Sequence, residues 1–161
     1  MKKNYICFCS ILFVMFFGIL TFSCDNGTIM VDTALNGSWK SGGLIWHDKI
    51  FFLNGVFEQS RLYIDPESEV FVYKGTYTTN DGIIYFNITH LHGHFLKSDF
   101  SGLSGIEQKW YTKIELMQYL EEINYEGDFD IDYYYIPEIN IYSINGNELV
   151  INNNTTYTKI E

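Results

Sequence analysis

Two alternating apolar runs around an Asn-Gly pair, 45-IWHDKIFFLNGVFEQSRLYI-64, decide the fold class of this chain. Asn-Gly between alternating apolar residues is the strongest short-range signal for a β-hairpin with a two-residue turn. Such a turn places Phe52 opposite Phe57, and Trp46 opposite Tyr63. Because side chains alternate across a strand, these rings lie on one face, which we expect to be the core.

A second hairpin follows, in which 69-EVFVYKGTYTTN-80 and 83-IIYFNITHLHGH-94 flank Asp81-Gly82. A two-residue turn there places the bulkier apolar residues of both strands on one face, and this agreement supports the register. A glycine among these large neighbours indicates a bend or a close approach between strands. The predicted pairs are Tyr77 with Phe86, Gly75 with Ile88, Tyr73 with His90, and Phe71 with His92.

The pattern changes after the second hairpin. Residues 95–106 are rich in glycine and serine and predict a loop. Thr112 and Glu115 then fit a capping box, which predicts one amphipathic helix over 113–123. The apolar residues expected on its buried face are Ile114, Met117 and Leu120.

Alternation typical of a strand returns in the tyrosine-rich stretch 124-NYEGDFDIDYYYIPEINIYSI-144, where Pro137 indicates an edge strand or a break. Asn145-Gly146 marks another turn, and the last residues predict a final strand. About seven or eight short strands joined by tight turns indicate a closed barrel or a sandwich. We predict an all-β fold, an antiparallel up-and-down barrel of about eight strands with one inserted helix, because closure leaves no strand edge exposed.

Charge and motifs limit the classes of function. The chain has 20 acidic and 10 basic residues, a net charge of −10. Such a surface repels phosphates, so we expect no nucleic-acid partner. The sequence holds no phosphate-binding loop and no nucleophile elbow, and we expect neither an enzyme nor a cofactor. Cys7 and Cys9 lie in an apolar leader, which leaves Cys24 alone in the rest of the chain, without a partner for a disulfide.

The N-terminal segment has the layout of a secretory signal peptide. Lys2 and Lys3 precede an almost wholly apolar run over 6–22, and the small residue Ser23 stands before Cys24. The run is also long enough to serve as an uncleaved signal anchor. In both cases the positive residues before the run orient the domain toward the exported side of the membrane.

The stretch 19-ILTFSC-24 resembles the lipobox of bacterial lipoproteins, with threonine three residues before the cysteine where leucine is usual. The resemblance implies that residues 1–23 are removed and that Cys24 carries lipid, palmitate included. Two or more acyl chains hold a protein stably to a membrane. Residues 24–34 would then be a tether, and 35–161 a single domain anchored in a bacterial cell envelope, on its periplasmic or surface face.

A second resemblance concerns the start of the domain. Gly37-Ser38-Trp39 is similar to the Gly-x-Trp of lipocalins and related calycin barrels, so that the chain resembles a bacterial lipoprotein with a lipocalin-like domain. The resemblance implies that Trp39 closes one barrel end, packed by a basic residue of the last strand. Lys159 holds that position here, where the family usually has arginine.

We expect the barrel interior to form a pocket for a small, partly apolar ligand, as the resemblance implies. The alternative is a non-catalytic structural or surface-interaction lipoprotein whose barrel is filled by its own side chains. An enclosed apolar pocket of about 300 Å³ or more favours the first function, and a packed interior favours the second. The candidate lining residues are Trp46, Phe52, Phe57, Tyr63, Phe71, Tyr73, Tyr77, Phe86, His90 and His92.

Histidines alternate at positions 90, 92 and 94, so that neighbouring ones lie about 6.6 Å apart along one strand face. His90 and His92 are close enough to share a zinc ion, but a cluster with the spacing of a metal motif is lacking. We favour polar caps where the barrel interior opens, beside Tyr73 and Phe71, and expect no metal site.

Two further sets of charged residues are candidates for a binding site. Arg61, the one arginine, faces Asp48 across the first hairpin, either as an ordinary cross-strand pair or as a group at the barrel mouth that meets an anionic headgroup. Acidic residues alternate at 128, 130 and 132, but a calcium loop needs glycine where Tyr133 stands. We interpret these acidic residues as a solvated connection.

Overall fold

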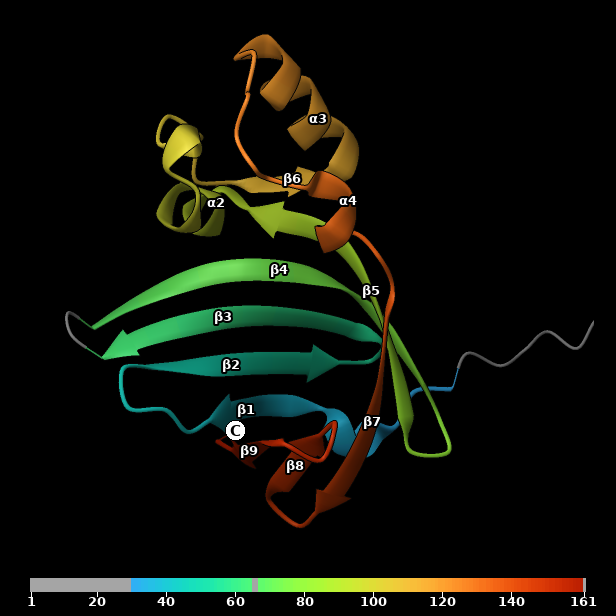
Figure 1. The fold of residues 1–161 in the computed structure, drawn as a ribbon. Coiled ribbons are helices and arrows are strands. Elements are labelled where there is room, and N and C mark those ends of the chain that lie inside the picture. The colour runs from blue at the N-terminus through green and yellow to red at the C-terminus, as the bar shows by residue number, and fades with distance from the viewer. Residues whose placement is uncertain (1–29, 65–66, 161) are drawn as a thin grey trace, which may run out of the picture.

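The computed structural model describes residues 30–64 and 67–160. They form an antiparallel barrel with a largely helical insertion at one end (Figure 1). The predicted signal peptide 1–23, Cys24 and the first residues of the predicted tether lie outside the described residues. Within the described part of the chain, no helix is both long and apolar enough to cross a bilayer.

The barrel wall is a meander of eight strands. A pairing between β4 and β5 closes the strand order β4-β3-β2-β1-β9-β8-β7-β5 into a ring. The prediction of an all-β, lipocalin-like up-and-down barrel is therefore confirmed. The strands are β1 (Gly37–Ser41), β2 (Trp46–Leu53), β3 (Val56–Ile64), β4 (Glu67–Asn80), β5 (Ile83–His92), β7 (Glu138–Asn145), β8 (Glu148–Ile151) and β9 (Thr155–Lys159).

The two predicted hairpin turns have the expected backbone. Asn54 and Gly55 have φ values of 48° and 88°, and Asp81 and Gly82 have 47° and 77°. Two successive positive φ values are the mark of the tight turn that matches the twist of paired strands. The predicted pairs are confirmed along the whole first hairpin, from Phe52 with Phe57 to Trp46 with Tyr63, and near the second turn, where Tyr77 pairs with Phe86.

Farther from the second turn the predicted register is wrong, because β5 contains a bulge. Gly75 pairs with Ile88, but the next pair is Lys74 with His90, which leaves Thr89 as an extra residue. One extra residue turns every later side chain to the opposite face. Tyr73 therefore pairs with Leu91 and not with His90. His90 and His92 lie on the outer face of the wall.

A second bulge lies between β3 and β4. Gln59 pairs with Tyr73, and Ser60 with Phe71, so that Val72 is the extra residue. Beyond this bulge Phe71 also lies on the outer face, which corrects its predicted interior position. Both corrections have one cause: a bulge reverses the alternation on which the sequence-based assignment depended.

Trp39 is fully buried. Its indole Nε1 donates a hydrogen bond to the backbone oxygen of Leu35, 2.6 Å away, at the end of the 3-10 helix η1 (Thr33–Leu35). Lys159 pairs with Trp39 between β9 and β1, and its Nζ lies 5.0 Å from the centre of the ring. These contacts join the chain before β1 to the last strand.

Residues 93–137 form the insertion between β5 and β7. It contains α2 (Gly93–Asp99), the 3-10 helix η2 (Ser101–Leu103), β6 (Trp110–Thr112), α3 (Lys113–Glu122) and α4 (Ile131–Tyr134). The insertion is attached to an edge that it shares with the barrel wall: β5 pairs with β7 through Ile83–Phe86 and with β6 through His90–His92. The barrel therefore closes below the point at which the insertion begins (Figure 1).

The insertion differs from its prediction in two places. The predicted capping box is present, with the Thr112 amide donating to Glu115 Oε2 over 2.8 Å, but α3 buries Leu116 and leaves Ile114 and Met117 exposed. The expected glycine-serine loop 95–106 holds α2 and η2, because Phe95 and other apolar side chains there pack into a small core of the insertion.

Candidate functional site

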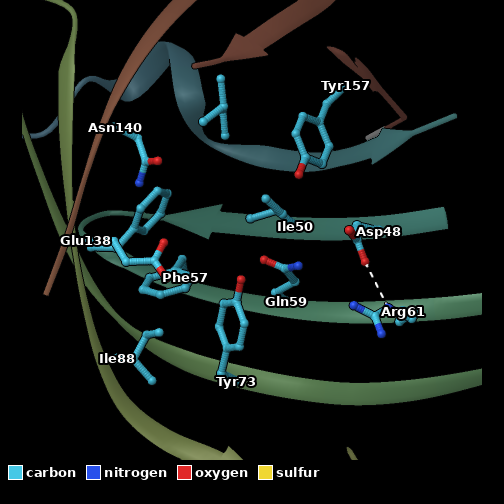
Figure 2. Close-up of a pocket in the computed structure, with 12 residues that line it drawn as sticks. Asp48, Ile50, Phe57, Gln59, Arg61, Tyr73, Ile88, Glu138, Asn140 and Tyr157 are labelled. Atoms are coloured by element: carbon cyan, nitrogen blue, oxygen red, sulfur yellow. Dashed lines mark hydrogen bonds and ion pairs between the residues drawn. The ribbon is translucent and has the colours of Figure 1, made fainter. Parts of the chain in front are cut away.

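A cavity of about 330 Å³ lies inside the barrel and is partly open to solvent. Seven of the eight wall strands contribute to it, so the cavity exists only because the wall is closed. Figure 2 shows Glu138 and Asn140 at one end, with Asp48 and Arg61 at the other. Its lining consists of Asp48, Ile50, Phe57, Gln59, Arg61, Tyr73, Phe86, Ile88, Glu138, Asn140, Ile151 and Tyr157.

One wall of the cavity is apolar. The rings of Phe57 and Phe86 meet edge to face with centroids 4.7 Å apart, and Ile88 continues this surface along β5. Behind them, Phe52 and Tyr77 fill the adjoining interior, with centroids 5.0 Å apart. Apolar side chains thus form one wall of the cavity, a surface of the kind that ligand pockets use, while the rest of the lining is largely polar.

An ion-pair chain lies at the other end of the cavity. Arg61 Nε is 3.4 Å from Asp48 Oδ1, and Arg61 Nη1 is 3.7 Å from Asp99 Oδ2 at the end of α2. The guanidinium also lies 4.6 Å from the ring centre of Trp46, a residue with 42% of its surface exposed. Burial raises the pKa of Asp48 by more than Arg61 and Gln59 lower it. The predicted pairing of Asp48 with Arg61 is confirmed.

Two phenol groups point into the cavity from opposite walls, Tyr73 from β4 and Tyr157 from β9 (Figure 2). Tyr157 is only 6% exposed, and among the described residues its hydroxyl has no hydrogen-bond partner. Burial raises the pKa of Tyr157 to about 12, and Asp48 adds to the shift. Burial also raises the pKa of Tyr73, with smaller contributions from Glu138, Tyr157 and Asp48.

The predicted lining is found in part. Phe57, Tyr73 and Phe86 line the cavity, as predicted. Phe52 and Tyr77 are buried in the core beside it, Tyr63 packs partly buried against the core, and Trp46 stands near Arg61. The structure does not bring Phe71, His90 or His92 to the cavity, because of the two bulges.

Two of the residues wrongly predicted to line the cavity, Phe71 and His92, lie in a cluster with Trp110 on the outer surface instead. His92 lies 4.8 Å from Trp110 and 5.6 Å from Phe71, measured between ring centroids, and Lys74 Nζ lies 4.6 Å from the Trp110 ring centre. Burial, His94 and Lys74 together lower the pKa of His92. Among the described residues, no three histidine, cysteine or acidic side chains are close enough to hold a metal ion.

The acidic stretch before α4 has a local structural role. Asp130 Oδ1 accepts hydrogen bonds from the backbone amides of Asp132 and Tyr133, at 3.0 and 3.4 Å, and so caps the first turn of α4. A carboxylate at this position satisfies amides that have no partner within the helix.

Several lining residues were missed by the sequence analysis, above all Glu138, Asn140 and Tyr157 on the late strands. Glu138 pairs with Phe86 across β7 and β5, and directly paired residues share a face, so Glu138 points inward. The inward orientation of Glu138 can be inferred only when β5 is known to be the pairing partner of β7. The sequence does not indicate this pairing, because the insertion separates β7 from β5 in the chain. Comparisons of the chain with protein-family models, with curated proteins and with solved structures find no match.

Proposed function

We propose that this chain is an exported lipoprotein, anchored to a membrane, whose barrel binds a small, partly apolar ligand. The observation that supports ligand binding is the cavity of about 330 Å³, because binding sites for small molecules typically occupy about 300–1,000 Å³ with an apolar wall and a few polar groups. The cavity holds roughly the volume of ten water molecules, enough for a compact organic ligand.

The proposed relationship to lipocalins is supported by more than the strand order. The Gly-x-Trp segment places Trp39 against Lys159 of the last strand, with 5.0 Å between the ring centre and Nζ. This is the contact that the resemblance implies.

The proposed anchor depends on the leader and Cys24. Mass spectrometry of the membrane fraction should find an N-terminal peptide that begins at a lipid-modified Cys24. A Cys24→Ser variant should lose the lipid, and any stable membrane attachment that it keeps is then due to an uncleaved apolar run over 6–22. A mature protein that still begins at Met1 would contradict cleavage and favour an uncleaved anchor.

Ligand binding is tested by native mass spectrometry of the protein purified from the cells that produce it. We expect additional retained mass on the unmodified protein. Ile88→Trp adds bulk to the cavity wall and should abolish the retained mass, whereas Tyr85→Trp adds a similar ring to the exposed outer face of β5 and should leave it unchanged. Equal retention by the two variants, or no retained mass on the unmodified protein, argues against the proposal.

A surface-interaction lipoprotein is the second candidate function, and one observation favours it. The outer face of the β5–β7 pair carries Tyr85 opposite Ile139, and Ile83 opposite Ile141. Ile139 is 69% exposed and Ile141 is 57% exposed. Contiguous apolar side chains at a protein surface often mark an interaction site. If Ile139→Ser with Ile141→Ser removes a membrane-associated partner and the ligand test fails, this second function is the better one.

A further inference from the structure

We propose that the cavity selects ligands that carry a positively charged ammonium group on an apolar body. This inference rests on the proposed ligand-binding function and names the chemical class of the ligand. Three features support it: the balance of charges in the lining, the acceptor groups left open to the cavity, and the aromatic rings that surround them.

The charged groups of the lining sum to a negative charge. Asp48 and Glu138 are its carboxylates, and Arg61 is the one cationic side chain among the described lining residues. Arg61 is in turn contacted by two carboxylates, Asp48 at 3.4 Å and Asp99 at 3.7 Å. Its charge is therefore compensated within the protein, and an anionic ligand group near it would also meet Asp48 and Asp99. We accordingly do not propose the anionic headgroup that Arg61 alone suggested.

Glu138 is the acceptor best placed for a ligand. Glu138 is an exposed residue at one end of the cavity, and Figure 2 shows its carboxylate directed inward beside Phe57. Among the described residues Glu138 forms no ion pair within 4.0 Å. A carboxylate next to an aromatic ring suits an ammonium group, which forms charge-assisted hydrogen bonds with the first and a cation–π contact with the second.

The interior offers a second open acceptor. The Tyr157 side chain is largely buried, but its hydroxyl points into the cavity, is accessible there and has no hydrogen-bond partner among the described residues, so a ligand N–H can donate to it. The negative charges that line the cavity also favour a cationic ligand group. The negative charges of Glu138 and Asp48 contribute to the raised pKa of the Tyr73 phenol, which means that they disfavour a further negative charge there. The net charge of −10 attracts cations from solution as well.

The experiment uses three probes with one carbon frame and different charge: 4-phenylbutylamine, 4-phenylbutanol and 4-phenylbutyrate. Binding to the full chain in nanodiscs of zwitterionic phosphatidylcholine is measured by calorimetry, with empty nanodiscs as the blank. We expect the amine to bind about tenfold more tightly than the alcohol, because its ammonium gains a carboxylate and an aromatic face, and expect the carboxylate probe to bind most weakly.

Variants test the assignment to the cavity. Glu138→Gln should weaken amine binding about threefold, the range for a partly exposed charge pair. Glu148→Gln, on the exposed end of β8 and away from the lining, is the matched control and should leave amine binding unchanged. In the double variant Asp48→Asn with Glu138→Gln, Arg61 is the remaining charged group of the lining, so the preference should shift toward 4-phenylbutyrate. Thermal melting of each variant checks that it is folded.

The outcomes separate this inference from the proposed function. Equal or tighter binding of the alcohol or the carboxylate probe to the unmodified protein overturns the ammonium preference, while binding in the cavity stands. An amine preference that survives the folded double variant overturns the assignment to this lining. Absence of binding by all three probes also overturns the inference, and the proposed function then depends on the retained mass in native mass spectrometry.

Discussion

Gly75 lies at a close approach between β4 and β5, and its replacement by alanine should lower the stability of the barrel. A Cβ built on Gly75 would stand 2.0 Å from the backbone oxygen of Asn87 and 3.0 Å from the Cα of Ile88. Both atoms belong to the backbone of β5, so no rotation of a side chain relieves the contact. The strands must separate by about 1 Å or more beside the bulge at Thr89, because contacts this short do not occur between non-bonded atoms.

The expected loss of stability follows from the hydrogen bonds that break and the strain that arises when the two strands separate. Loss of two ladder hydrogen bonds costs about 1 kcal/mol each. Strain in a well-packed wall adds about 1–3 kcal/mol. We expect Gly75→Ala to lower the free energy of unfolding by about 3 kcal/mol, which for a domain of this size corresponds to a melting temperature lower by about 10 °C.

Gly42 provides the matched control. It lies in the exposed loop between β1 and β2, and a Cβ there would meet nothing within 4 Å. Gly42→Ala should change the free energy of unfolding by less than about 0.5 kcal/mol. Thermal unfolding followed by tryptophan fluorescence measures both variants. If Gly75→Ala and Gly42→Ala melt within about 1 °C of each other, the close approach of β4 and β5 is wrong.

Three further predictions concern pH, the barrel end and the insertion. Because the pKa of Tyr157 is raised to about 12, its contribution to the free energy of unfolding is fully present below about pH 10 and is lost as the pH rises through 12. The loss should be about 2 kcal/mol at pH 12. In urea unfolding at several pH values, the Tyr157→Phe variant should lose less stability over this range than the unmodified protein. Trp39→Phe leaves the buried oxygen of Leu35 without its indole donor and should cost about 1–3 kcal/mol in urea unfolding, so an unchanged midpoint would count against that hydrogen bond. Thr112→Ala removes the cap of α3 and should cost about 1 kcal/mol, while Thr112→Ser retains most of the stability; equal loss in both variants would contradict the capping role.

The parts of the fold that the sequence predicted correctly are those with local causes. The backbone at Asn54-Gly55 and Asp81-Gly82 needs positive φ values, which these residue types adopt readily, and a two-residue turn fixes the pairing of the residues beside it. The capping box at Thr112 is equally local. Each of these features is decided by residues within a few positions of one another.

The bulges were missed because nothing local marks them. The bulge at Thr89 exchanges which residues of β5 face inward, and Leu91 becomes fully buried while His90 and His92 face outward. Burying an apolar side chain is favourable and burying an imidazole without partners is costly, so the bulged register is the better one. The comparison between the two registers needs the finished barrel, since only then is it known which face is enclosed.

The candidate site was predicted on the early strands and missed on the late ones. Phe57, Tyr73 and Phe86 belong to the two hairpins with recognised turns. Glu138 and Tyr157 reach the cavity through pairings that close the ring, between β5 and β7 and between β9 and β1. Such long-range pairings are determined by the whole wall, and they add Glu138, Asn140 and Tyr157 to the polar lining residues Asp48, Gln59 and Arg61 of the early strands.

One edge of β5 pairs with both β7 and β6, and this arrangement decides which part of the sequence can vary without changing the barrel. Since the ring is complete without residues 93–137, their length and composition can change while the order of the wall strands stays the same. Asp99 belongs to that exchangeable part and touches Arg61 at the rim of the hollow. Substitutions confined to residues 93–137 can therefore change the charges that surround Arg61 while the order of the wall strands is kept.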